Sequence, residues 1–191
     1  MQLFLSLNVS DLSFEDIRFS KLIQNLEKGK IDYYAVPVNH LNIPLIQIPD
    51  VAKYSYIGLK ESLKKILPHH KPFTLKLSGL QSYPSQEKAE MLWIGVQNSR
   101  ELRHLQEDLA ATLNIKSATL LHPHIPFMHF KKVTNVSTFI SPFKNFNFGH
   151  NKVKEIKLLE KLPNLFFMRY LGSLKLEFDS YSNDNFFNSP I

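Results

Sequence analysis

"PVNHLNIPL", residues 37–45, and "LHPHIPFMH", residues 121–129, are the two stretches that decide how this chain folds. Each places a histidine, His40 or His124, at the start of an apolar run that is typical of a β-strand. Both runs lie in a chain of ordinary hydrophobic content, so neither is explained by a general excess of apolar residues. The question is why two otherwise apolar strands begin in the same way.

Side chains two positions apart share one face of a strand. His40 should therefore point the same way as Asn42, and His124 the same way as Pro126, with the apolar residues between them pointing into a core. A single histidine on an apolar strand is usually a hydrogen-bonded core residue, and that alternative stays open here. Two histidines at matching places favour a shared functional site.

The surroundings of the two histidines repeat one order of elements. A strand at 2–9 and a helix over 11–30 precede His40, and a strand at 91–97 followed by a Leu-rich helix precedes His124. This order indicates an internal duplication about a pseudo-twofold axis. The same order also arises by chance in α/β and α+β chains.

The caps and the remaining elements follow from local signals. Gly29 is expected to end the first helix, Asp50 to cap a helix over 50–68, and Asn98 to begin the Leu-rich helix. The Leu-rich helix carries an apolar stripe of Leu102, Leu105, Leu109 and Leu113. The other expected strands are at 71–80, 152–162 and 166–178, the last two paired; part of 152–162 also has a helical pattern.

Composition narrows the class of protein. The 191 residues carry a formal charge of +6, which suits an anionic partner such as RNA but also an unspecialised basic surface. There is no cysteine, which excludes disulfides, thiolate metal sites and cysteine nucleophiles. With no leader pattern or membrane-length apolar run, we expect a cytoplasmic monomer. One bilobal domain is expected over 1–180, and a polar tail over 181–191.

Two facing imidazoles suit phosphodiester chemistry. Histidine titrates near pH ~6.5, so one neutral ring can accept a proton while a charged partner donates one. Each such positioned group typically contributes ~10²–10⁴-fold in rate, without a metal or another cofactor. A metal pair of His122 and His124 is the alternative, but it lacks an obvious third ligand. The chain has no Gly-rich phosphate loop, which disfavours ATP-driven ligation.

The ordered set "QLFLSL", "HLNI" (40–43), "KPFTLKLSGL", "MLWIGV" and "HPHIPF" resembles the 2H phosphoesterase superfamily of LigT-like proteins. That resemblance implies an α+β, bilobal fold in which two antiparallel-rich sheets form a central groove with helices outside. It also implies metal-independent opening of 2',3'-cyclic phosphates at RNA ends by His40 and His124, and the reverse, ATP-independent 2'-5' ligation.

The chain departs from the family pattern at the hydroxyl residue of each motif. Asn42 stands in the first and can still donate to a phosphate oxygen; Pro126 stands in the second and cannot donate. A catalytically weakened or inactive module that binds RNA ends or nucleotides is therefore the alternative function. The candidate phosphate-binding residues are Asn42, His129, Lys131 and Lys132, and the candidate base-stacking residues are Tyr33, Tyr34 and Phe127.

Overall fold

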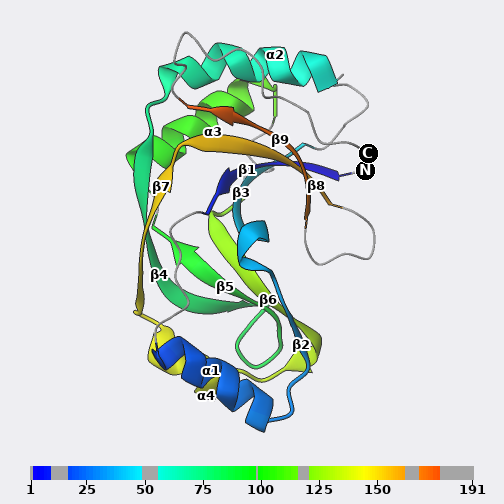
Figure 1. The fold of residues 1–191 in the computed structure, drawn as a ribbon, viewed down its shortest axis with the longest axis vertical. Coiled ribbons are helices and arrows are strands. Elements are labelled where there is room, and N and C mark those ends of the chain that lie inside the picture. Colours follow the sequence, from blue (N-terminus) through cyan, green and yellow to red (C-terminus); the bar gives the residue numbers. More distant parts are fainter. Residues whose placement is uncertain are drawn as a thin grey trace.

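The computed structural model describes residues 2–9, 17–48, 56–97, 99–115, 121–161 and 168–176. Two antiparallel sheets lie one above the other in Figure 1, and the helices lie on their outer sides. This arrangement confirms the expected α+β fold of two antiparallel sheets with helices outside. Within the described ranges, no helix is long and apolar enough to cross a membrane.

The upper sheet in Figure 1, called sheet A, has four strands in the order β3-β1-β8-β9. Their bounds are β1 Gln2–Asn8, β3 Asn42–Ile48, β8 Glu155–Lys161 and β9 Met168–Lys175. The pairing of β8 with β9 confirms the two paired strands expected near the end of the chain, and β8 is a strand rather than a helix.

The lower sheet, called sheet B, has five strands in the order β2-β6-β5-β4-β7. Their bounds are β2 Tyr33–Ala35, β4 Phe73–Tyr83, β5 Ala89–Val96, β6 His124–Thr134 and β7 Asn147–Val153. The sequence pattern did not predict β7, whose residues alternate in burial beside β4. The short strand β2 joins the edge of sheet B, where it pairs with β6.

α1 and α3 each pack on the sheet to which the strand before them does not belong. α1 (Ile17–Lys28) follows β1 of sheet A, yet it lies with α4 (Ser137–Ile140) beside sheet B. α3 (Arg100–Thr112) follows β5 of sheet B, yet it packs with α2 (Tyr56–Ile66) against β3 of sheet A. The exchange ties the two sheets together.

The repeated unit expected from the sequence is present as two antiparallel strand pairs. β1 pairs with β3 and places Asn8 opposite Asn42, while β5 pairs with β6 and places Gly95 opposite His124. In both pairs, the histidine motif lies where the second strand begins, next to the end of the first. The two halves are therefore related in topology as well as in order.

β3 and β6, the strands that the two motifs open, meet where the sheets join. The backbone N–H of Leu121, just before β6, donates to the carbonyl of Leu45 in β3 at 3.0 Å. The side-chain amide of Gln106 in α3 donates to both Leu45 and Leu121 carbonyls, at 3.3 and 3.0 Å. Helix α3 thus clamps the two motif strands together.

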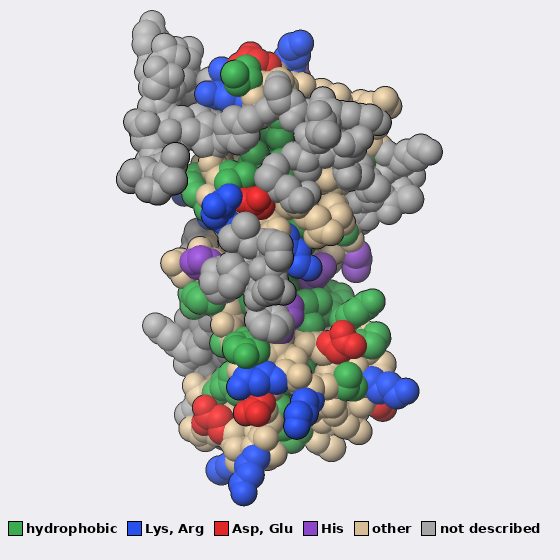
Figure 2. Space-filling view, turned by 90° about the vertical axis from the view of Figure 1, so that its right-hand side faces the viewer, with side chains coloured by type: hydrophobic (Ala, Val, Ile, Leu, Met, Phe, Trp, Pro, Cys, Tyr) green, Lys and Arg blue, Asp and Glu red, His purple; other side chains and the backbone are tan. Residues whose placement is uncertain are grey.

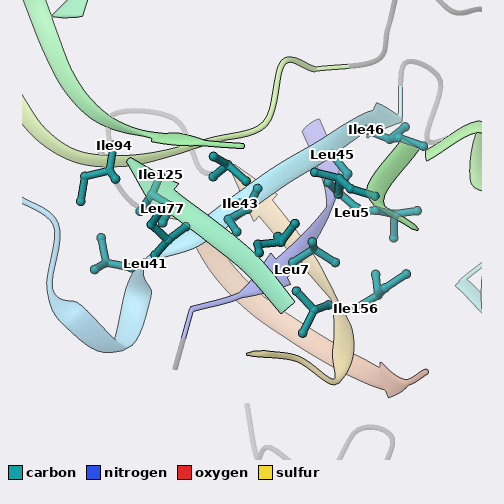
Figure 3. Close-up of a cluster of buried hydrophobic side chains, with 14 of the residues drawn as sticks. Leu5, Leu7, Leu41, Ile43, Leu45, Ile46, Leu77, Ile94, Ile125 and Ile156 are labelled. Atoms are coloured by element: carbon teal, nitrogen blue, oxygen red, sulfur yellow. The ribbon is translucent and has the colours of Figure 1, made fainter. Parts of the chain in front are cut away.

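Leucine and isoleucine side chains fill the space around this junction. Figure 3 shows residues of both sheets in one buried cluster, including Leu41 and Ile125, which directly follow the two histidines. Both are almost fully buried, as the strand alternation predicts. The Leu-rich stripe of α3 is also buried: Leu102, Leu105, Leu109 and Leu113.

Two helix ends differ in detail from expectation. Gly29 does follow the last residue of α1, but the left-handed residue that ends the helix is Lys30, with φ 52°. The N–H of Ile31 then reaches the carbonyl of Leu26, as in a Schellman motif. α3 is capped by Ser99, whose hydroxyl accepts from the N–H of Leu102 at 3.1 Å. Asn98, Asp50 and the tail 181–191 lie outside the described residues.

Candidate active site

The sequence pattern predicted that His40 begins a strand, and this prediction is wrong. His40 instead ends a 3-10 turn over Val38–His40 that follows Pro37. The strand begins at Asn42, whose side-chain amide donates to the backbone carbonyl of His40 at 3.0 Å. Asn42 is buried, and this hydrogen bond fixes the end of the turn to the start of β3. The amide NH₂ has a second hydrogen that this bond does not use.

His124 is the first residue of β6, as expected. Its Nδ1 lies 2.6 Å from the backbone oxygen of His122. Because a carbonyl oxygen only accepts, Nδ1 carries the ring proton, and Nε2 is the basic nitrogen of the neutral ring. The tautomer of His124 is therefore set by the residue two positions before it.

The surroundings of His124 favour its neutral form. Burial lowers the pKa of His124, and the neighbouring His122 ring lowers it too, while the hydrogen bond to the His122 carbonyl opposes them. The Trp93 ring lies edge-on, with its centroid 5.1 Å from that of His124 and 6.3 Å from that of His122. Sequence reasoning missed Trp93, because it reads as one more residue of a buried strand.

A hollow of about 410 Å³ lies beside His40. The turn and the start of β3 form one side of it, and β8 and β9 form the other. His124 is not among its lining residues, so this hollow collects the first motif and part of sheet A. Its lining residues are Asn39, His40, Leu41, Asn42, Glu155, Lys157, Leu159, Met168, Tyr170 and Ser173.

His129, five residues after His124, lies in the same strand, β6. His129 pairs with Tyr34 across β2 and β6. Burial lowers the pKa of His129, and the nearby charge of Lys161 in sheet A lowers it further. A neutral His129 can donate one hydrogen bond but brings no charge. Lys161, which sequence reasoning missed, supplies a cation there from the other sheet.

The two lysines expected near the second motif, Lys131 and Lys132, lie on opposite faces of β6. The ammonium group of Lys131 lies 5.1 Å from the centre of the Tyr34 ring, a cation–π distance. Lys132, one residue further along the strand, is exposed and points to the opposite face by strand alternation. Lys131 therefore lies on the same face as His129, and Lys132 does not.

Of the three aromatic candidates for base stacking, only Tyr34 presents its ring. Tyr34 is 45% exposed beside Lys131. The Tyr33 hydroxyl instead donates to Glu27 of α1 at 3.4 Å, and burial raises the pKa of Tyr33, with Glu27 adding to the rise. Phe127 is 4% exposed in the core. Tyr33 thus joins β2 to α1, and Phe127 packs in the core.

Figure 2 shows where the histidines gather on one face. The histidine side chains visible there lie at mid-height, at the level where the two sheets of Figure 1 meet. Lysine and arginine side chains are spread over the whole height of this face. Within the described part of the chain, no group of three or more His, Asp or Glu residues is arranged to hold a metal ion.

The fold, with a histidine motif opening one strand in each half, matches a known protein family. A model of the 2'-5' RNA ligase superfamily matches residues 11–163, and the chain belongs to that family. The resemblance to LigT-like proteins drawn from the sequence is thereby confirmed.

Two curated relatives are named RNA 2',3'-cyclic phosphodiesterase. The protein of Archaeoglobus fulgidus is 22% identical over 166 residues, covering 85% of this chain and 92% of the relative. The protein of Aquifex aeolicus is 23% identical over 133 residues, covering 65% of this chain and 70% of the relative.

Solved structures share the fold. TT0787 of Thermus thermophilus aligns with a TM-score of 0.62 and 18% identity, covering 94% of this chain and all of that one. E. coli LigT complexed with 3'-AMP aligns with a TM-score of 0.58 and 21% identity, covering 91% of this chain and 94% of that one.

Proposed function

We propose that this protein opens 2',3'-cyclic phosphates at RNA ends by general acid–base catalysis with His40 and His124. The observation that supports the proposal is the hydrogen bonding of Leu121, which precedes β6, and of Gln106 to Leu45 in β3, because β3 and β6 are the strands that follow the two histidine motifs. The names of the two curated relatives support the same reaction.

The surroundings of His124 support the role of base for this residue, and the role of acid then falls to His40. His124, neutral and with Nδ1 bound to a carbonyl, accepts the proton of the attacking water at Nε2. The water oxygen bonds to phosphorus, and one ester P–O bond breaks. His40, in its charged form, donates a proton to the leaving ribose oxygen. The product is an open phosphate monoester, and both histidines have exchanged protonation states.

Charge on the phosphate oxygens is balanced from both sheets. Asn42 of the first motif, whose amide keeps a second N–H, and Lys157 line the same hollow. Lys161 and His129 serve the second motif, where Pro126 offers no donor. The same groups serve 2'-5' ligation, in which a ribose 5'-hydroxyl replaces water as the nucleophile. Its oxygen bonds to phosphorus, the bond from phosphorus to O3' breaks, and a 2'-5' linkage forms without ATP. RNA ends and small cyclic nucleotides both present the required phosphate.

The experiment compares wild-type protein with His40→Ala and His124→Ala on a 2',3'-cyclic RNA end in the presence of EDTA. Each variant should lose at least ~10²-fold in kcat/KM. His104→Ala, an exposed histidine of α3, is the matched control and should keep wild-type activity. Activity that EDTA abolishes and a divalent metal restores would overturn the mechanism. Binding of the RNA end without turnover would identify the non-catalytic alternative.

A further inference from the structure

The hollow beside His40 has a second wall that neither histidine motif supplies. Glu155 and Lys157 face it from β8, and Tyr170 and Ser173 face it from β9. Leu159 and Met168 add an apolar surface. The hollow has the size of a small-ligand site, and its mainly polar lining suits a polar ligand such as a nucleotide.

Tyr170 is held in place before any ligand arrives. Its hydroxyl donates to the Ser173 hydroxyl at 3.2 Å, and Ser173 donates to the Glu155 carboxylate at 2.9 Å. Tyr170 is 51% exposed, and the Lys157 ammonium lies 6.0 Å from the centre of its ring. An exposed ring fixed by its hydroxyl is a stacking platform that loses little freedom on binding a flat ligand.

Glu155 is the unexpected member of this wall. Its carboxylate repels phosphate, in a groove whose other charged lining residue is Lys157. Among the described residues, no cation lies within ion-pair distance of it, and its hydrogen bond from Ser173 uses one of about four acceptor positions. The carboxylate therefore remains able to accept hydrogen bonds from a ligand edge that carries N–H groups.

We propose that this wall, formed by Glu155, Lys157, Tyr170 and Ser173, is a nucleobase subsite that selects guanine. Guanine presents two adjacent N–H donors, N1–H and N2–H, to the two oxygens of a carboxylate. Adenine and cytosine present one amino donor beside a ring nitrogen acceptor, and uracil presents one N–H between two carbonyls. We expect the subsite to prefer guanine, then adenine and cytosine, then uracil, with each base stacked on Tyr170. Lys157 is left for the ribose-phosphate of the same nucleotide.

The subsite rests on the proposed function, because the base belongs to the RNA whose cyclic phosphate reacts. The test uses the sixteen dinucleotides that end in a 2',3'-cyclic phosphate, so that each base occurs at each position. Wild-type kcat/KM should be highest for guanine at one of the two positions. Glu155→Gln should lower kcat/KM about 5- to 150-fold for those guanine substrates and leave uracil substrates unchanged. Tyr170→Leu should lower kcat/KM by a similar factor whichever base occupies that position.

Matched controls come from sheet B. Glu90→Gln and Tyr83→Leu change an exposed carboxylate and an exposed tyrosine outside the hollow, and they should keep the wild-type base order. An unchanged base order in Glu155→Gln overturns the selection of guanine, and so does an equal loss for all four bases. Unchanged kcat/KM in Tyr170→Leu overturns the stacking platform.

A binding arm separates this inference from the proposed function. Calorimetry measures the binding of the open dinucleotides that end in a 3'-phosphate to the same proteins. Base-dependent binding that falls in Glu155→Gln and Tyr170→Leu, without turnover of any cyclic substrate, keeps the subsite and rejects the phosphodiesterase. Turnover that requires His40 and His124 but ignores the base, Glu155 and Tyr170 keeps the phosphodiesterase and rejects the subsite.

Discussion

Replacing Trp93 by leucine should move the acid limb of the pH–rate profile to higher pH. Trp93 lies edge-on against His124, with ring centroids 5.1 Å apart, and burial is the largest cause of the lowered pKa of His124. Leucine covers less of the imidazole, so water reaches the ring and the charged form becomes easier to form. Since neutral His124 is the proposed base, activity falls on the acid side.

The size of the effect is bounded by the ordinary histidine pKa of about 6.5. The midpoint of the acid limb in Trp93→Leu should rise from its lowered position towards that value. At a pH well below both midpoints, each unit of rise lowers the neutral fraction of His124 about tenfold, which corresponds to about 1.4 kcal/mol. Loss of the edge-on ring pair should also cost about 0.5–1.5 kcal/mol of folding free energy.

The assay is kcat/KM for a 2',3'-cyclic substrate as a function of pH, together with an NMR titration of the histidine rings. The His124 signal is assigned from its loss in His124→Gln, and exposed His104 is the internal control, whose midpoint should not move. A His124 midpoint that stays in place or falls in Trp93→Leu would refute the assignment of the lowered pKa to burial by this side chain. A wild-type midpoint at or above the ordinary value would refute the neutral base itself.

Three further outcomes are expected. Pro126→Thr should change turnover little, because His129 and Lys161 already serve the phosphate oxygen that Pro126 cannot bind. A rise of about tenfold, which corresponds to the about 1.5–3 kcal/mol of a charge-assisted hydrogen bond, would contradict this assignment. Ser99→Ala should lower the free energy of unfolding by about 1 kcal/mol in a denaturant titration without changing kcat/KM, because the N-cap of α3 is lost. The pKa values of His124 and His129 are lowered in the folded protein, so the unfolded chain binds more protons between those values and about 6.5. The free energy of unfolding should therefore rise with pH over that interval. Replacing both His124 and His129 by glutamine should flatten this rise.

Local pattern predicted most of the elements because strand alternation and helix periodicity act over a few neighbouring residues. The Leu-rich stripe of α3 and the strand opened by His124 are such cases. Cap residues were harder, because neighbouring residues compete for one role. Ser99 rather than Asn98 caps α3, and Lys30 rather than Gly29 takes the left-handed conformation after α1.

The turn at His40 could not be predicted from alternation. The apolar run from Leu41 onwards is continuous with His40 in sequence, but Pro37 starts a 3-10 turn that His40 ends. The buried amide of Asn42 then binds the His40 carbonyl, and the strand begins only there. A side chain that satisfies a carbonyl two residues away outweighs the strand pattern, since an unpaired buried polar group is costly.

By itself, the sequence determined the two histidine motifs, their repeated strand–helix–strand setting and the family to which the chain belongs, because each of these is carried by residue order and local periodicity. Only the tertiary structure decided that α1 and α3 exchange sheets, that α3 clamps β3 to β6, and that β8 and β9 supply the second wall of the hollow. These features depend on pairings between segments far apart in the chain, and the energy of such contacts depends on which surfaces meet once the sheets have formed.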